Sequence, residues 1–173
     1  MSRVAEAYLF IRKNNMKINI GSNAERIEGY KSVDLFAEAD YKDDVRTMDT
    51  FPNDSVEEVR AFHLLEHLAD KDVMPAMKAV WRILNPGGRF VIEVPSLPGV
   101  LKQFLETPEE DRWGYRLWTI FGLQSDEGQF HKTGFSDRRI WTMLKDAGFS
   151  KVTTNVSYSE KYAQEVIDVE AVK

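Results

Sequence analysis

One run, residues 56–94, restricts the fold of this chain more than any other feature. The apolar side chains of residues 72–84 recur at intervals of three and four, which is typical of a helix with one buried face. A turn sequence, Asn-Pro-Gly-Gly, follows at residues 85–88, and residues 89–94 are strongly β-prone. Residues 56–62 form a further expected strand before the helix. Strand, helix, turn and strand in this order predict an α/β protein with a mostly parallel sheet.

Weaker patterns on either side extend this layer. Residues 17–20 alternate between polar and apolar and stop at Gly21, and residues 32–35 predict a second short strand. A final helix is expected over residues 137–147, followed by a strand over residues 152–156. Residues 163–173 are interpreted as another strand or as a frayed tail. Residues 2–14 fit a short helix.

The chain contains no internal repeat and no low-complexity linker, which favours one domain over residues 1–173. Within it, residues 1–16 are interpreted as an N-terminal helix or arm. Residues 96–134 are irregular and rich in aromatic residues, and we interpret them as an insertion on the substrate side. The aromatic side chains at 113, 115, 118 and 121 are spaced as if to pack this insertion.

Composition excludes several classes of function. The 23 basic and 28 acidic side chains leave a formal charge of −5, which disfavours a broad nucleic-acid surface. The sequence has no cysteine, so disulfides, thiolate metal sites and cysteine nucleophiles are excluded. The early apolar run 7–11 is far shorter than the roughly 20 residues of a membrane helix. We therefore expect no membrane span and a cytoplasmic protein.

Two residues at expected strand ends suggest a nucleoside ligand. Ligands of parallel α/β sheets gather at the carboxyl ends of the strands. Gly21, after the first strand, would let the backbone approach a ligand, and Asp34, at the end of the second, could accept hydrogen bonds from a ribose diol. A nicotinamide cofactor would suit the same pair, but its fingerprint needs two further glycines. A turn glycine and a capping aspartate remain the structural alternative.

Several short strings, taken in order, resemble one known family. They are residues 18–23 with 29–35, residues 44–48 with 51–56, residues 63–67, and residues 82–89. Together they resemble the class I S-adenosylmethionine-dependent methyltransferases, in particular the small type-11-like group. The resemblance implies a doubly wound, mostly parallel Rossmann-like sheet. In that fold residues 56–62 would be the fourth strand, residues 89–94 the fifth, and the aromatic-rich insertion would follow the fifth.

The resemblance also implies S-adenosylmethionine as cofactor and a set of residues to bind it. The first-strand loop would surround the methionine part, Asp34 would hold the ribose hydroxyls, residues 44–47 would face the adenine, and His63 would lie near the methyl donor. The expected cofactor-binding residues are Asn19, Gly21, Ser22, Asp34, Leu35, Asp44, Arg46, Thr47 and His63. Asn23 stands where the family favours a glycine, and asparagine tolerates positive φ better than most residues.

The three histidines are the only side chains whose ordinary pKa lies near neutrality. A hydroxyl acceptor would need a nearby base, and His63 and His131 are the expected catalytic residues. His67 is expected to make a structural hydrogen bond instead. His63 and His67 are four residues apart, but Leu64 stands where the zinc-protease pattern has glutamate and no third ligand is evident. No metal is therefore predicted.

The sequence predicts methyl transfer from S-adenosylmethionine to a small-molecule or saccharide acceptor that it does not identify. Two alternatives stay open. One is a weakly active or inactive methyltransferase-like module that binds a partner, which the Asn23 substitution would favour. The other is the nicotinamide-dependent oxidoreductase, disfavoured by the missing glycines. A homodimer is a further expectation, in which a neighbouring chain would complete the site.

Overall fold

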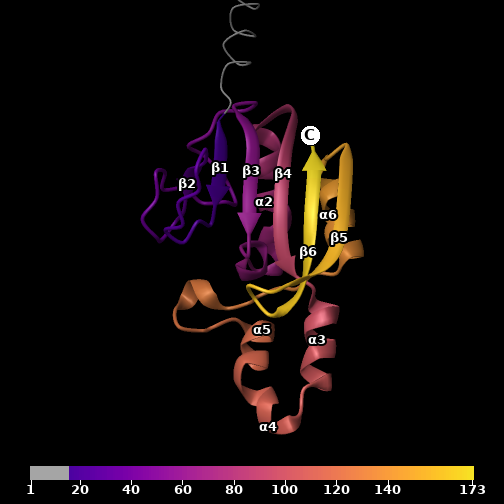
Figure 1. Ribbon diagram of the computed structural model, residues 1–173. Helices are drawn as coiled ribbons and strands as arrows, with labels where there is room; N and C mark the ends of the chain where they lie inside the picture. The colour runs from indigo at the N-terminus through magenta and orange to yellow at the C-terminus, as the bar shows by residue number, and fades with distance from the viewer. Residues whose placement is uncertain (1–15) are drawn as a thin grey trace, which may run out of the picture.

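A six-stranded sheet forms the centre of the molecule in the computed structural model, which describes residues 16–173 (Figure 1). Its strand order is β2-β1-β3-β4-β6-β5. The strands are β1 (Lys17–Ile20), β2 (Lys31–Val33), β3 (Val56–Phe62), β4 (Leu84–Pro95), β5 (Lys151–Ser159) and β6 (Gln164–Val172). The first four are parallel, whereas β6 is antiparallel to both of its neighbours. The α/β fold with a mostly parallel sheet is confirmed.

Two amphipathic helices, α2 (Asp70–Ile83) and α6 (Asp137–Ala147), pack beside each other on one face of this sheet (Figure 1). Their apolar stripes meet alternating side chains of the strands, and the aliphatic and aromatic residues of that layer are almost fully buried. The Ser136 side chain caps the start of α6 by accepting from the Arg139 N–H, and Gly148 ends it with a φ of +111°. The expected helices over 72–84 and 137–147 are confirmed.

The opposite face of the sheet carries a row of charged side chains. Glu58 on β3 is hydrogen-bonded to Tyr30 and to Arg89 on β4, and Arg89 also reaches Glu170 on β6 at 3.4 Å. Within residues 16–62 no helix crosses from one strand to the next, and residues 21–30 connect β1 to β2 by turns alone. The connection between β1 and β2 therefore contains no helix.

Two expectations about the strands need correction. Residues 34–55 contain no strand, and Tyr41 makes only a single bridge to Val33. Residues 56–62 therefore form the third strand, β3, and not the fourth, and residues 89–94 belong to the fourth, β4, and not the fifth. The insertion consequently follows the fourth strand and not the fifth. The turn expected at residues 85–88 is the irregular first part of β4, where the pairing with β3 shifts register. Of the two alternatives for residues 163–173, the strand is confirmed, since β6 lies inside the sheet.

The insertion forms a helical lobe, residues 97–129, below the carboxyl edge of the parallel strands (Figure 1). It contains α3 (Leu97–Glu106), α4 (Glu109–Asp111), η2 (Arg112–Arg116), α5 (Leu117–Phe121) and η3 (Glu127–Gln129). Gly122 and Phe130 form a bridge that brings the chain back toward the sheet. The helix expected at residues 2–14 lies outside the described residues. In the described part of the chain, no helix has the length and apolar character needed to span a membrane.

Candidate active site

The loop after β1 turns sharply and packs against the chain that leaves β3. Gly21 has a φ of +62°, and a Cβ there would lie 2.6 Å from Cδ1 of Leu64, so the loop requires a residue without a side chain. Asn23 follows with a φ of +44°, as the tolerance of asparagine for this region predicts, and Ala24 has a φ of +63°. The Oγ of Ser22 is buried and has no hydrogen-bond partner among the described residues. The loop therefore holds a buried polar atom that still lacks a hydrogen-bond partner.

Asp34 connects this loop to the next one. Its Oδ2 accepts a hydrogen bond from the Asn23 backbone N–H at 2.9 Å, and its Oδ1 accepts from the N–H groups of Phe36 and Ala37, both at 2.8 Å. Leu35 and Phe36 leave 44% and 82% of their surface exposed beside this carboxylate. A negatively charged acceptor thus lies between two turns, next to apolar surface on which a flat ligand could rest.

Residues 44–53 form a compact loop that Arg82, on α2, holds in place. The Arg82 guanidinium donates to the carbonyls of Thr47, Met48 and Phe51 at 3.0, 2.8 and 2.9 Å, and to Oδ1 of Asn53 at 2.8 Å. Sequence reasoning noted this arginine as part of a string but gave it no role. Every residue has a backbone carbonyl, so the sequence does not show that Arg82 bonds to these groups. Only the place of Arg82 in the 82–89 string could have indicated a role.

Replacing Arg82 by methionine should lower the free energy of unfolding by about 1.5–3 kcal/mol, because hydrogen bonds from a charged group are lost and loop carbonyls are left unpaired. Urea unfolding measures this loss, and hydrogen exchange should show faster exchange in residues 47–53. Lys78→Met is the matched control, an exposed position on the same helix. Equal unfolding midpoints for the two variants would contradict the proposed anchoring.

Asp44 and Arg46 form an ion pair within this loop. The Arg46 Nε donates to the carboxylate at 2.9 Å, and this hydrogen bond lowers the pKa of Asp44. Arg46 also comes within 3.8 Å of Asp72 at the start of α2. The carboxylate of Asp44 therefore remains ionised and is fixed in direction.

His63 lies at the end of β3, with a φ of +50° and its ring between two carboxylates. Nδ1 is 3.0 Å from Oε1 of Glu66 and Nε2 is 3.0 Å from Oε1 of Glu93. Burial lowers the pKa of His63, but the hydrogen bonds to Glu66 and Glu93 outweigh it and raise the pKa to about 9. The ring of Tyr162 packs 3.9 Å from it. At neutral pH His63 is a cation, which does not suit a general base.

His67 and His131 face each other, although they come from distant parts of the chain. Their ring centroids are 4.9 Å apart in an edge-to-face arrangement. The N–H groups of Lys132 and Thr133 donate to the Glu66 carbonyl at 2.8 and 3.2 Å, which holds the chain after His131 against η1 (Leu65–His67). Burial lowers the pKa of the His131 imidazole. The ring of His63 lies between Glu66 and Glu93, whereas that of His67 faces His131.

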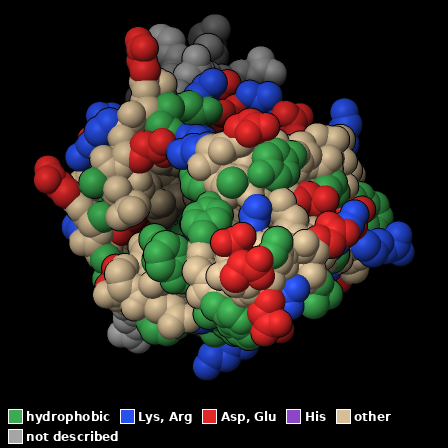
Figure 2. All heavy atoms as spheres, turned by 60° about the horizontal axis from the view of Figure 1, so that its bottom comes forward, with side chains coloured by type: hydrophobic (Ala, Val, Ile, Leu, Met, Phe, Trp, Pro, Cys, Tyr) green, Lys and Arg blue, Asp and Glu red, His purple; other side chains and the backbone are tan. Residues whose placement is uncertain are grey.

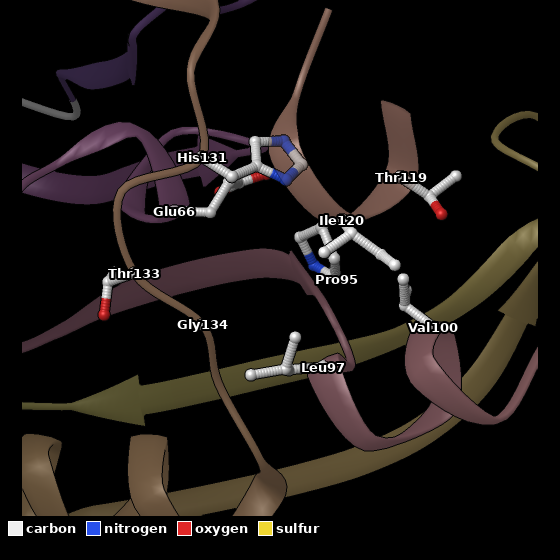
Figure 3. Close-up of a pocket in the computed structure, with 9 residues that line it drawn as sticks. All are labelled: Glu66, Pro95, Leu97, Val100, Thr119, Ile120, His131, Thr133 and Gly134. Atoms are coloured by element: carbon white, nitrogen blue, oxygen red, sulfur yellow. The ribbon is translucent and has the colours of Figure 1, made fainter. Parts of the chain in front are cut away.

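A cavity of about 10 Å³ lies under His131 (Figure 3). Glu66, Thr119, His131 and Thr133 supply its polar lining, and apolar residues of β4, α3 and α5 supply most of the rest. In Figure 3 the His131 ring lies close to the Glu66 carboxyl group. The cavity joins the segment after β3 to the helical lobe, so it lies on the side of the sheet edge where the insertion was expected to receive a substrate.

The aromatic side chains of the helical lobe are less buried than their spacing suggested. Trp113, Trp118 and Phe121 leave 62%, 50% and 50% of their surface exposed. Figure 2 looks toward the end of the molecule that carries the lobe and shows hydrophobic side chains scattered among charged ones. The expectation that this group packs the insertion is correct only in part, as in the contact of Trp113 with Phe104 at 5.6 Å.

Comparison with known families gives a match over most of the chain. A family model described as a methyltransferase domain matches residues 15–154. No curated protein sequence matches the chain significantly.

Solved structures of similar fold come from several organisms. A SAM-dependent methyltransferase from Archaeoglobus fulgidus has a TM-score of 0.63 and 15% identity, with 99% of this chain and 91% of that one covered. A possible histamine N-methyltransferase from Thermotoga maritima has a TM-score of 0.64 and 12% identity, covering 98% and 95%. Phosphoethanolamine N-methyltransferase 2 of Haemonchus contortus, in complex with S-adenosyl-L-methionine, has a TM-score of 0.57 and 14% identity, covering 99% and 53%.

Proposed function

The chain belongs to the methyltransferase domain family, and we propose that it transfers a methyl group from S-adenosylmethionine to a small-molecule or saccharide acceptor. The observation that carries the proposal is the pair of turns at the carboxyl edge of β1 and β2, joined by the hydrogen bond from Asn23 to Asp34. Asn23 takes the positive φ that the turn needs, so the substitution does not favour an inactive module. The family match likewise disfavours the oxidoreductase alternative.

The residues at this edge fit the cofactor. Gly21 has the positive φ that the turn needs and no Cβ to collide with Leu64, and the unpartnered Oγ of Ser22 can bond to an amino-acid moiety. We propose that Asn19, Gly21 and Ser22 hold the methionine part, that Asp34 and Leu35 hold the ribose, and that Asp44, Arg46 and Thr47 face the adenine. When bound, S-adenosylmethionine supplies an electrophilic methyl group on a sulfonium that departs as a thioether. The protein then contributes mainly by orienting the acceptor and excluding water.

The two candidate catalytic histidines have different proposed roles. His63, positively charged and fixed by Glu66 and Glu93, positions the edge of the cofactor site. His131, which lines the cavity beside the helical lobe, is proposed to meet the acceptor. The exposed aromatic side chains of the lobe offer surface on which a sugar or another small metabolite can pack. A homodimer remains a prediction.

Replacing Asp34 by alanine should weaken binding of S-adenosylmethionine at least about tenfold, because a hydrogen bond to a charged group contributes roughly 1.5–3 kcal/mol. Calorimetric titration with S-adenosylmethionine and with S-adenosylhomocysteine measures the loss. Glu38→Ala removes a nearby exposed carboxylate and is the matched control. Asp34→Asn keeps one acceptor oxygen, enough for the Phe36 and Ala37 N–H groups but not for that of Asn23 as well, so hydrogen exchange of residues 21–37 in both variants is needed to detect loop disorder.

Failure of the wild-type protein to bind either ligand would refute the proposal. Tight binding of S-adenosylmethionine without methylated product, in a screen of hydroxyl, amine and saccharide acceptors, would support the partner-binding module instead. Product formation that is lost in Asp34→Ala would establish the transferase.

A further inference from the structure

We propose that Glu66, His67 and His131 bind a divalent first-row transition-metal ion, with zinc the preferred one. Each of the three side chains offers one ligand atom, and these atoms all lie within 4.8 Å of one another. Two imidazoles and one carboxylate form a common ligand set of catalytic zinc and other transition-metal sites, and they leave a position open for water or substrate. This differs from the sequence analysis, which considered His63 with His67 and found no third ligand.

Glu66 provides the strongest single indication of a ligand. Its side chain is 2% exposed, and Oε1 is satisfied by His63 at 3.0 Å. Its other oxygen, Oε2, is buried and has no hydrogen-bond partner among the described residues. A carboxylate oxygen that is buried without a partner costs free energy, and a cation beside it would remove that cost.

A hydrogen bond at one ring nitrogen orients His67, as is usual for metal-binding histidines. Nδ1 of His67 lies 3.1 Å from the backbone carbonyl of Phe130, so its N–H can donate there and leave Nε2 free to bind an ion. Metal-binding histidines commonly donate the second ring N–H to a carbonyl or carboxylate, which fixes the tautomer and the direction of the free nitrogen. Glu66 is fixed in the same manner by His63.

The distances between the three ligand atoms would fit a metal ion after small rotations of the side chains. Three atoms at the corners of such a triangle lie at most roughly 2.8 Å from its centre, against about 2.0–2.2 Å for nitrogen and oxygen ligands of zinc. The required contraction is under about 1 Å at each side chain. The adjoining cavity, about 10 Å³ and lined by Glu66 and His131, is near the size of one water molecule. A water or an acceptor oxygen could occupy the open position there.

The ion site itself does not depend on the proposed function, but its role in the reaction does. In a methyltransferase, His131 would act on the acceptor as a metal ligand and not as a general base, and the acceptor would be one that offers an oxygen atom to the ion. The three ligands include none of the proposed cofactor-binding residues, so the ion and the cofactor can be tested separately.

The test is calorimetric titration of the untagged, chelator-treated protein with Zn²⁺, Mn²⁺ and Mg²⁺. We expect one equivalent of Zn²⁺ to bind with micromolar or lower Kd, and more tightly than Mg²⁺ because imidazole favours zinc. Glu66→Gln and His131→Ala should each weaken binding at least about tenfold. Glu57→Gln is the matched control, since Oε2 of Glu57 is also buried without a partner but lies outside the cluster. Circular dichroism verifies that each variant is folded.

Zinc binding absent from the wild type, or equally strong in Glu66→Gln and His131→Ala, would overturn the proposal. The chain has three histidines and no cysteine, so residual zinc sites of comparable affinity are not expected elsewhere. Titration with S-adenosylmethionine in the presence of chelator completes the design. Cofactor binding without zinc binding refutes the ion site alone, whereas zinc binding without cofactor binding refutes the methyltransferase proposal alone.

Discussion

Replacing His63 by leucine should lower the free energy of unfolding by roughly 3 kcal/mol, because it leaves the buried carboxylate of Glu66 and the partly buried one of Glu93 without the cation between them. The side chain of Glu66 is 2% exposed and that of Glu93 is 16% exposed, so water would solvate these carboxylates only in part after the imidazolium is removed. Chemical denaturation at neutral pH with chelator present measures the loss. The variant should unfold in a single transition at clearly lower denaturant.

Two further variants identify the cause. The triple variant His63→Leu/Glu66→Leu/Glu93→Leu removes all three charges and should recover much of the loss, since apolar side chains can replace a buried ion cluster. His67→Leu, one turn later, loses the hydrogen bond to Phe130 and the edge-to-face contact with His131, and it should cost about 0.5–1.5 kcal/mol. If His63→Leu costs no more than His67→Leu, the charge cluster does not stabilise the fold.

Replacing Phe90 by alanine should lower the free energy of unfolding by about 3–5 kcal/mol. Phe90, on β4, is fully buried, and its ring stacks on that of Phe149 at 5.9 Å, just after the glycine that ends α6. The cavity left behind would separate the central strand from this helix end. Thermal and urea unfolding both measure the effect, with a lowered midpoint expected in each.

Phe36→Ala is the control for this substitution. Phe36 is 82% exposed, so truncation there should change stability by less than about 0.5 kcal/mol. A small loss in Phe90→Ala would mean that the neighbouring side chains close the cavity or that β4 and α6 are not coupled through this stack.

The sequence alone predicted the helices and strands that depend on a local pattern of residues. Helix α2 and strand β4 follow from apolar spacing over short windows, and Gly21 and Asp34 follow from their places at strand ends. The position of β6 could not be predicted in this way, because alternation in residues 163–173 indicates a strand without indicating which strand it pairs with. The resemblance implied one more strand before residues 56–62, but the structure has only a single bridge at Tyr41 there. Local sequence did not predict this, because an isolated bridge depends on tertiary context.

Some features of the candidate site could likewise be predicted from the sequence, and others could not. The turn at Asn23 was predictable because it depends on the backbone preference of one residue. The approach of His131 to Glu66 and His67 was not, because it requires the helical lobe to fold and return through the bridge between Gly122 and Phe130. The contacts of Arg82 were equally hidden, since its partners are mostly backbone carbonyls that any sequence possesses.

The position of β6 between β4 and β5 has a kinetic consequence. In this sheet β5 joins the other strands only through β6, the later of the two in the chain. Until β6 pairs, β4 presents an open edge, the kind of surface that recruits strands from other molecules. We therefore expect refolding to pass through a species in which the parallel strands have formed but this edge is exposed, and aggregation during refolding to rise with protein concentration.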